Sequence, residues 1–203
     1  MILTALTDEP PPLERLDDHR TGACIEVTDS ALGCSAVFDL MMRVANLPLL
    51  DAAYMTSSKP TGLSRTAYAL VDGKAVAVVE ANVRTYVREE HHAMLSFLVQ
   101  PEFRGLGFAT LLSSVVVRSL SQSHEALMNC GFVSAQIFDC NVDSERVALK
   151  LGLLRNNELD FTDGNRSGAG FTSPAAVVLQ HAMGRIDSRC ICAHESSYAH
   201  MRQ

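Results

Sequence analysis

The residues best suited to chemistry lie in one stretch, from Met94 to Leu120. An apolar run of strand length, Met94 to Val99, leads through Pro101 into Arg104-Gly105-Leu106-Gly107, and residues with helical spacing follow. A tight glycine turn before a helix leaves the first helical N–H groups without partners, at the end where the helix dipole places partial positive charge. Because Gly105 and Gly107 have no side chains, a phosphate can approach the backbone, and Arg104 adds a permanently charged donor. The pattern predicts a cradle for phosphate or pyrophosphate. A bare Gly-x-Gly is equally typical of a strand-to-helix turn that needs glycine only for geometry.

Two related phosphate motifs do not fit this stretch. The dinucleotide fingerprint needs a third glycine where Thr110 stands, and an acidic residue about 20 positions further on, where Asn129 and Cys130 stand instead. A P-loop needs Gly-Lys-Ser or Gly-Lys-Thr, and neither follows here.

The elements before the turn read as three successive antiparallel strands. Tyr68–Val71 and Ala75–Val79 flank Asp72-Gly73, a pair typical of a type I′ hairpin turn. The second strand could continue toward Val87. A charged turn, 88–92, would then lead to the third strand, Met94–Val99.

The elements after the turn read as helix, strand and helix. The first helix has an apolar face, with Ser113, Ser114 and Arg118 expected to point away from it. That face consists of Leu111, Leu112, Val115, Val116 and Leu120. A break at 128–131 precedes a strand, 132–140, which should lie parallel to the Met94 strand because a helix crosses between them. The second helix, 141–151, would end at Gly152.

The two ends of the chain are less regular. Residues 1–20 read as an arm, 23–27 as a strand, and 30–55 as two helices followed by a polar loop. Near the other end, 158–161 and 175–182 read as strands around a Gly-rich loop, 162–174, that holds Arg166. Residues 184–203 could cover a neighbouring surface, form a homodimer arm or be disordered.

Composition favours one globular domain. The 203 residues are 47% hydrophobic, and no apolar run could span a bilayer. The N-terminus has no signal-peptide pattern, so we expect a cytoplasmic protein without membrane attachment. A net charge of −6 argues against nucleic-acid binding. The six cysteines have no zinc-ligand spacing, and no metal is expected.

The glycine stretch, from Val99 and Pro101 to Leu112, resembles the acetyl-CoA-binding segment of the GNAT superfamily of N-acetyltransferases. The family signature Arg/Gln-x-x-Gly-x-Gly/Ala is matched by Arg104, Gly107 and Ala109. A second family motif, near the end of the next strand, is matched by Asn141, Ser144, Lys150, Gly152 and Leu153. The resemblance covers about residues 66–154. It implies an α/β (α+β) fold over residues 21–183: a mixed, mostly antiparallel sheet with a central splayed pair of parallel strands, flanked by helices.

The resemblance also implies where acetyl-CoA, or another acyl-CoA, would bind as co-substrate. Main-chain groups of Phe97 and Val99 would bond the pantetheine arm, amides from Gly105 to Thr110 would hold the pyrophosphate, and Asn141 would reach the arm from the opposite strand. From sequence alone, Asn141 is equally a plain helix N-cap. The full set of predicted cofactor residues is Phe97, Leu98, Val99, Arg104, Gly105, Leu106, Gly107, Phe108, Ala109, Thr110, Asn141 and Ser144.

The implied reaction is direct attack of a primary amine on the thioester, which needs a general base and an acid for the departing thiolate. Glu80, in an apolar strand context, and His91 are the candidate bases, although a solvent-facing Glu80 and an exposed turn at His91 and His92 explain the same residues. Many relatives carry the acid as a tyrosine at the position of Ala148. Without it, Ser144 or water protonates the sulfur, or the free thiolate leaves, or catalysis is weak.

The sequence therefore predicts an acyl-CoA-dependent N-acyltransferase, with acetyl as the expected acyl group and a small-molecule or peptide amine as acceptor. The absent tyrosine leaves a second hypothesis open, a non-catalytic acyl-CoA-binding sensor or regulatory module. A third is an assembly scaffold without affinity for CoA.

Overall fold

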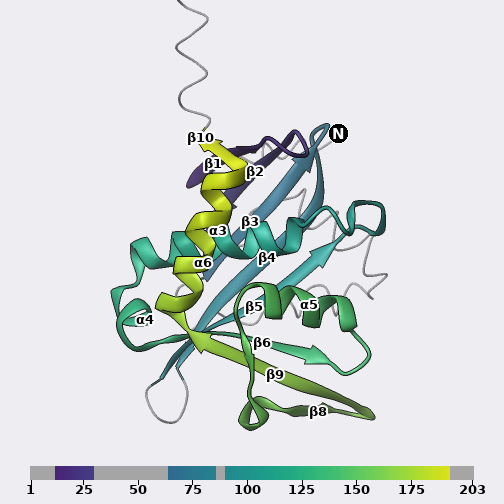
Figure 1. Cartoon of the computed structure of the whole chain (residues 1–203), viewed down its shortest axis with the longest axis vertical. Helices are drawn as coiled ribbons and strands as arrows, with labels where there is room; N and C mark the ends of the chain where they lie inside the picture. The colour runs from purple at the N-terminus through teal and green to yellow at the C-terminus, as the bar shows by residue number, and fades with distance from the viewer. Residues whose placement is uncertain (1–11, 30–63, 86–89, 193–203) are drawn as a thin grey trace, which may run out of the picture.

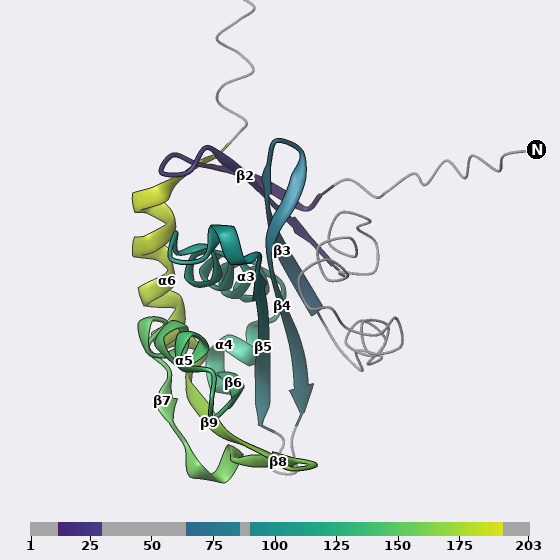
Figure 2. The ribbon, with the colours of Figure 1, turned by 90° about the vertical axis from the view of Figure 1, so that its right-hand side faces the viewer.

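The computed structural model describes residues 12–29, 64–85 and 90–192 of the chain. These residues form a ten-stranded sheet, and the described helices lie on one of its faces (Figure 1, Figure 2). The strands are β1 Glu14–Asp18, β2 Ala23–Thr28, β3 Ser64–Val71, β4 Lys74–Thr85, β5 His91–Val99, β6 Phe132–Phe138, β7 Leu154–Arg155, β8 Phe161–Asp163, β9 Arg166–Pro174 and β10 Cys190–Cys192. The helices are α3 Phe108–Ser123, α4 Glu125–Cys130, α5 Val142–Lys150 and α6 Ala175–Arg189, with 3₁₀ turns at Pro101–Phe103 and Asn157–Leu159.

The strand order is β10-β1-β2-β3-β4-β5-β6-β9-β7, with β8 paired to β9. Every pair is antiparallel except β5 with β6. Asp72 and Gly73 join β3 to β4 with φ of 50° and 72°, the positive angles that a type I′ turn requires. The three successive strands, the parallel pair and the mixed fold class are thus confirmed. The helices and loop expected at 30–63 lie outside the described residues.

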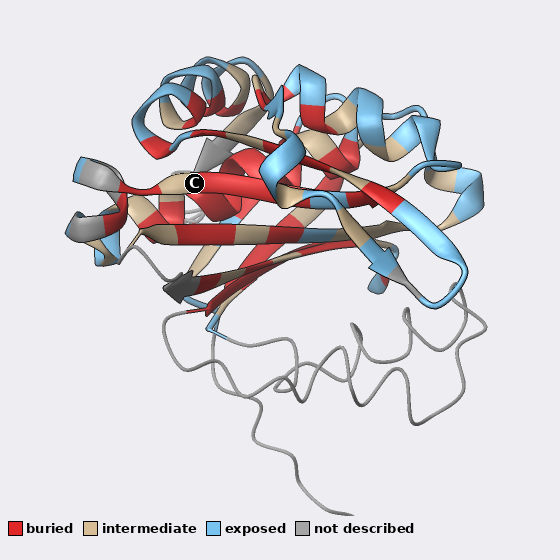
Figure 3. Ribbon diagram, turned by 90° about the horizontal axis from the view of Figure 1, so that it is seen from below, coloured by how far each residue is buried: buried red, intermediate tan, exposed pale blue. Residues whose placement is uncertain are grey.

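Helix α3 lies between the sheet and α6, and its predicted apolar face is buried. Figure 3 shows buried positions along the strands and on the inner sides of the helices. Ser113 and Ser114, which were expected to point away from the core, are also fully buried. The expectation was wrong because α6, which was not predicted as a helix, packs against α3.

The segment 175–182 was expected to be a strand, but it is the first half of α6. A short apolar run such as Ala175 to Leu179 fits either structure. The decisive pattern is longer: Ala175, Val178, Ala182 and Ile186 are buried at helical spacing. These residues pack toward α3, so tertiary contact favours the helix.

The Gly-rich segment 162–174 was expected to be a loop, but most of it is β9. This strand pairs with β6 from Phe132↔Pro174 to Phe138↔Gly168, so the ladder compensates for its low intrinsic strand propensity. A Cβ at Gly168 would lie 2.2 Å from the Phe161 ring. The glycine is therefore needed for close packing rather than for a loop. Residues 158–161, expected as a strand, divide between the second 3₁₀ turn and β8.

Three smaller differences concern element boundaries. The expected arm and C-terminal extension contribute β1 and β10, which pair with each other, and Leu16 of β1 is buried in the core. The charged turn ends earlier than expected, because His91 and His92 already belong to β5. The expected break at 128–131 is mostly the short helix α4. None of the helices in the described ranges is long and apolar enough to cross a membrane.

We expect Leu112→Ala, in the centre of α3, to lower the free energy of unfolding by about 2–5 kcal/mol, because the fully buried side chain would leave a cavity. Urea denaturation followed by circular dichroism measures this change. Leu149→Ala on α5 is the matched control, since Leu149 is 53% exposed and should change stability little. Equal losses in the two variants would contradict the placement of α3 at the core.

Candidate functional site

The two parallel strands at the centre of the sheet separate soon after they meet. Strands β5 and β6 pair only from His92↔Phe132 to Met94↔Ser134, although both continue well beyond these residues. Each strand then follows its antiparallel neighbour, β5 with β4 and β6 with β9. The Gln100 N–H donates to the Val76 carbonyl of β4 at 2.9 Å. Successive residues of a strand direct their main-chain N–H and C=O groups to opposite edges. The main-chain groups of Val99 and Phe97 therefore point away from β4, toward the gap.

The glycine turn stands at the mouth of this gap. Gly105 and Gly107 have φ of 80° and 83°, left-handed values that favour glycine. Gly107 is the N-cap of α3 and supplies no side-chain cap, and the first helical bond runs from the Leu111 N–H to the Gly107 carbonyl. The N–H groups of Phe108, Ala109 and Thr110 therefore have no acceptor within the helix. Together with the helix dipole they form a site suited to an anion.

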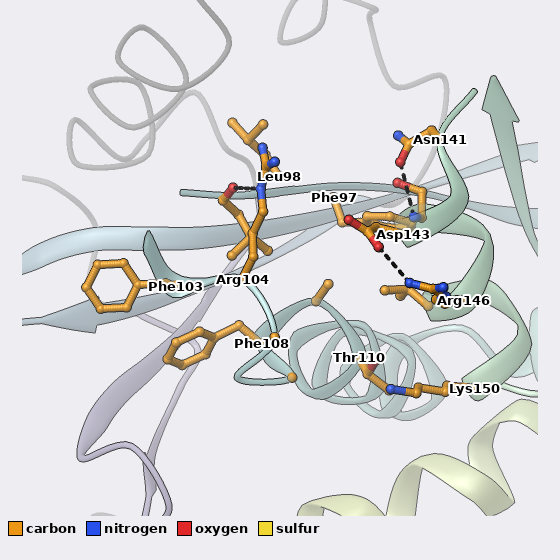
Figure 4. A pocket seen from close by; sticks show the side chains of 16 residues that line it. Phe97, Leu98, Phe103, Arg104, Phe108, Thr110, Asn141, Asp143, Arg146 and Lys150 are labelled. Atoms are coloured by element: carbon orange, nitrogen blue, oxygen red, sulfur yellow. Dashed lines mark hydrogen bonds and ion pairs between the residues drawn. The ribbon is translucent and has the colours of Figure 1, made fainter. Parts of the chain in front are cut away.

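Turn, gap and α5 enclose a cleft of about 630 Å³. Figure 4 shows Phe103 and Arg104 on one side of it and Asn141, Asp143 and Arg146 on the other. The cleft is lined by Phe97, Leu98, Val99, Phe103, Arg104, Gly105, Gly107, Phe108, Ala109, Thr110, Asn141, Asp143, Ser144, Arg146, Val147 and Lys150. The lining contains three cationic side chains, Arg104, Arg146 and Lys150, and one carboxylate, Asp143, although the chain as a whole carries a charge of −6. The cleft is thus locally basic and suits a polyanion.

Helix α5 forms the wall opposite the glycine turn. Asn141 caps it, with Oδ1 accepting the Ser144 N–H at 3.1 Å, so the N-cap interpretation of Asn141 is confirmed. Asp143 and Arg146 form an exposed ion pair at 3.2 Å. Ser144 is half-buried and lines the cleft, whereas Ala148 is fully buried in the core. The position of the family tyrosine therefore carries no hydroxyl.

The predicted cofactor residues are brought together: all of them except Leu106 line the cleft. Sequence reasoning missed five lining residues, Phe103, Asp143, Arg146, Val147 and Lys150. Four of these lie on α5, where Asp143, Val147 and Lys150 recur at helical spacing. This spacing, which follows Asn141 along the predicted helix, was the sequence signal that could have placed these residues in the cleft.

The two candidate bases are placed outside the cleft lining. Glu80 of β4 is half-buried and lies opposite Ser96 of β5, on the sheet face away from α3. His91 shares the face of Ala93 and Leu95, which are buried on the helical side, and its ring packs edge-on against His124 with centroids 5.4 Å apart. The structure therefore does not bring Glu80, His91 and Ser144 into one cluster.

A buried polar chain crosses the sheet where β5 and β6 are still paired. His92 Nδ1 lies 2.8 Å from Ser134 Oγ, which lies 2.8 Å from Thr172 Oγ1, and Glu90 is 3.5 Å from His92 Nε2. His92 and Ser134 are almost completely buried. Burial lowers the pKa of His92 below its ordinary value of 6.5, while the Glu90 carboxylate acts in the opposite direction.

This pKa shift predicts a pH dependence of stability. As the pH falls below 6.5, the unfolded chain protonates His92 but the folded chain does so only at a lower pH, so the free energy of unfolding should fall across that window. His92→Gln should flatten this part of the profile, as measured by urea denaturation at pH 7.5, 6.5 and 5.5. His19→Gln, which changes an exposed histidine, is the control and should keep the profile of the unchanged chain. A steep profile that persists in His92→Gln would contradict the assignment.

Comparisons with known proteins agree with this geometry. The model of the acetyltransferase (GNAT) family matches residues 24–153. An uncharacterized protein from Bacillus halodurans is 14% identical with a TM-score of 0.57, and the match covers 87% of this chain and 96% of that one. The ribosomal-protein-S18-alanine N-acetyltransferase from Escherichia coli is 14% identical with a TM-score of 0.52, covering 75% and 94%. Arabidopsis thaliana Naa50, in complex with the bisubstrate analogue CoA-Ac-MVNAL, is 13% identical with a TM-score of 0.52, covering 73% and 97%. A search of curated proteins found no match.

Proposed function

Because the chain belongs to the GNAT family of acetyltransferases, we propose that it binds acetyl-CoA, or another acyl-CoA, in the cleft and transfers the acyl group to a primary amine. One observation carries the proposal: uncapped N–H groups at the start of α3 stand beside the gap between β5 and β6. An anion site next to unpaired strand edges suits a ligand that combines a diphosphate with an extended amide-containing arm.

The residues present fit such a ligand. The amides from Gly105 to Thr110 would hold the diphosphate, and main-chain groups of Phe97 and Val99 would bond the pantetheine arm as an added strand does. The Val99 carbonyl now accepts from Arg104 Nε at 3.4 Å, a long bond that a pantetheine amide could replace. Arg104, Arg146 and Lys150 would neutralise phosphate charge. When bound, acyl-CoA would supply the activated thioester.

We assign the proton-transfer roles from position along the strands. Glu80 lies opposite Ser96, just beyond the last paired residues of β5 and β6, where the acyl end of an extended arm would lie. His91 lies six residues before Phe97, which is roughly 20 Å along a strand. Glu80 is therefore our first candidate for the general base and His91 the second. Ser144, whose side chain lines the cleft, is the candidate acid for the thiolate.

The acceptor is proposed as the amine of a small molecule or a peptide. Two GNAT-fold neighbours support a peptide or protein terminus: one is named as an alanine N-acetyltransferase of a ribosomal protein, and the other holds a CoA–peptide analogue. Identities of 13–14% carry no acceptor specificity, since acceptor walls vary on this fold.

We expect acetyl-CoA to bind the chain in isothermal titration calorimetry, and an amine panel to release free thiol from it. The panel should contain a diamine, an aminoglycoside and short peptides with free N-termini. Gly105→Asp, which places a carboxylate in the cradle, should weaken binding at least tenfold, whereas Gly164→Asp, at another positive-φ turn, should not. Undetectable binding by the unchanged chain would remove the proposal.

The second expected outcome concerns turnover. Glu80→Gln should lower kcat about 100-fold or more with little change in KM for acetyl-CoA, because general-base catalysis contributes this much. Glu145→Gln, an exposed carboxylate on α5, is the matched control. His91→Ala should have a smaller effect than Glu80→Gln. If Glu80→Gln turns over as fast as its control, Glu80 is not the base.

A second function, acyl-CoA binding without turnover, is favoured by the buried Ala148, which supplies no acid toward a thiolate. Thiol release with any amine of the panel would exclude it. Tight binding without release for the whole panel would favour it over the transferase.

A further inference from the structure

The last residue of α6, Arg189, forms a buried ion pair with Asp18 at the end of β1. Its Nε donates to Asp18 Oδ1 at 3.0 Å and its Nη2 donates to Oδ2. The Asp18 side chain is fully buried and also accepts from the Thr21 hydroxyl and the Arg20 N–H. These donors lower the pKa of Asp18 even though burial opposes the shift. The carboxylate thus holds the guanidinium in one orientation.

The remaining arm of the same guanidinium reaches the glycine turn. Arg189 Nη1 lies 3.4 Å from the Leu106 carbonyl oxygen, and a Cβ added at Gly107 would lie 3.0 Å from Nη1. The Leu106 carbonyl and the Gly107 N–H belong to one planar trans peptide and point in opposite directions. This contact is long for a hydrogen bond, but a carbonyl directed at Arg189 turns the Gly107 N–H away from α6. Gly107 lines the cleft and Arg189 does not, so this N–H is turned to the cleft side.

We propose that Arg189, fixed by Asp18, is a positioning residue that orients the Leu106–Gly107 peptide and so prepares the amide cradle at the start of α3 for a diphosphate. The inference rests on the proposed function, because the diphosphate is that of CoA. Arg189 contributes mainly orientation, since its charge is neutralised by Asp18. Both residues lie outside the 66–154 region that carries the family motifs. The chain thus uses its own terminal elements to support the cofactor turn.

The test must separate positioning from stability, because Arg189→Met alone leaves a buried carboxylate without its cation and could unfold the protein. The double variant Asp18→Asn with Arg189→Met replaces the buried ion pair by neutral groups, an exchange that is often tolerated. Arg189→Lys keeps the charge but loses the fork that bridges Asp18 and the turn. Arg15→Met breaks a different arginine–carboxylate pair, Arg15 with Glu26, and is the matched control.

The readouts are the Kd for CoA by calorimetry, the Kd for pantetheine by NMR titration, and Tm. We expect the double variant and Arg189→Lys to raise the Kd for CoA about tenfold, while the Kd for pantetheine, which lacks the diphosphate, stays within twofold. The Arg15→Met variant should bind both ligands as the unchanged chain does.

A double variant that binds CoA as tightly as Arg15→Met would overturn the inference and leave the proposed function standing. Equal weakening toward CoA and pantetheine would also overturn it, because a general loss of structure acts on both ligands. Absence of CoA binding by the unchanged chain would overturn the proposed function and the inference together.

Discussion

The site depends on one constraint in the sheet, the short parallel contact between β5 and β6. Every other strand pair is antiparallel, and these two strands stay together for only three residue pairs before each follows its own neighbour. The divergence leaves polar groups of Phe97 and Val99 without a strand partner at the centre of the fold. Main-chain groups of this kind can pair with an extended ligand, so the break in the sheet leaves the edge at which we propose that the ligand binds.

Helix α3 connects this edge to the core. Its length is buried between the sheet and α6, which fixes the helix, while its first turn emerges beside the gap with uncapped N–H groups. A rigid helix with an open N-terminus holds its dipole and donors in place without any side chain at the turn. The Asp18–Arg189 pair, from β1 and α6, contacts the turn at the Leu106 carbonyl. Core packing and the proposed anion site therefore share one element.

The two faces of the sheet have different roles. The face under α3 is mostly apolar, and its core residues include Ala67, Ala69, Ala77, Val79, Ala93 and Leu95. The opposite face carries the polar residues Glu80, Ser96, His92 and Ser134 at the level where β5 and β6 separate. Glu80 and His92 thus lie on the face away from α3, next to the point where the gap begins, whereas His91 lies on the helical face.

The sequence alone determined the features that depend on neighbouring residues, the Asp72-Gly73 hairpin and the glycine turn, because local φ angles fix each of them. It left the role of Asn141 open, and the structure shows the helix cap. The family resemblance also placed eleven of the sixteen residues that line the cleft, and four of the five that it missed lie on α5. Only the tertiary structure decided that 175–182 is helical, that Ser113 and Ser114 are buried beneath it, and that Arg189 reaches Leu106. Those outcomes depend on contacts between segments far apart in the sequence, such as Arg189 and Leu106, which are 83 residues apart. Short apolar runs and isolated charges carry no information about such distant partners.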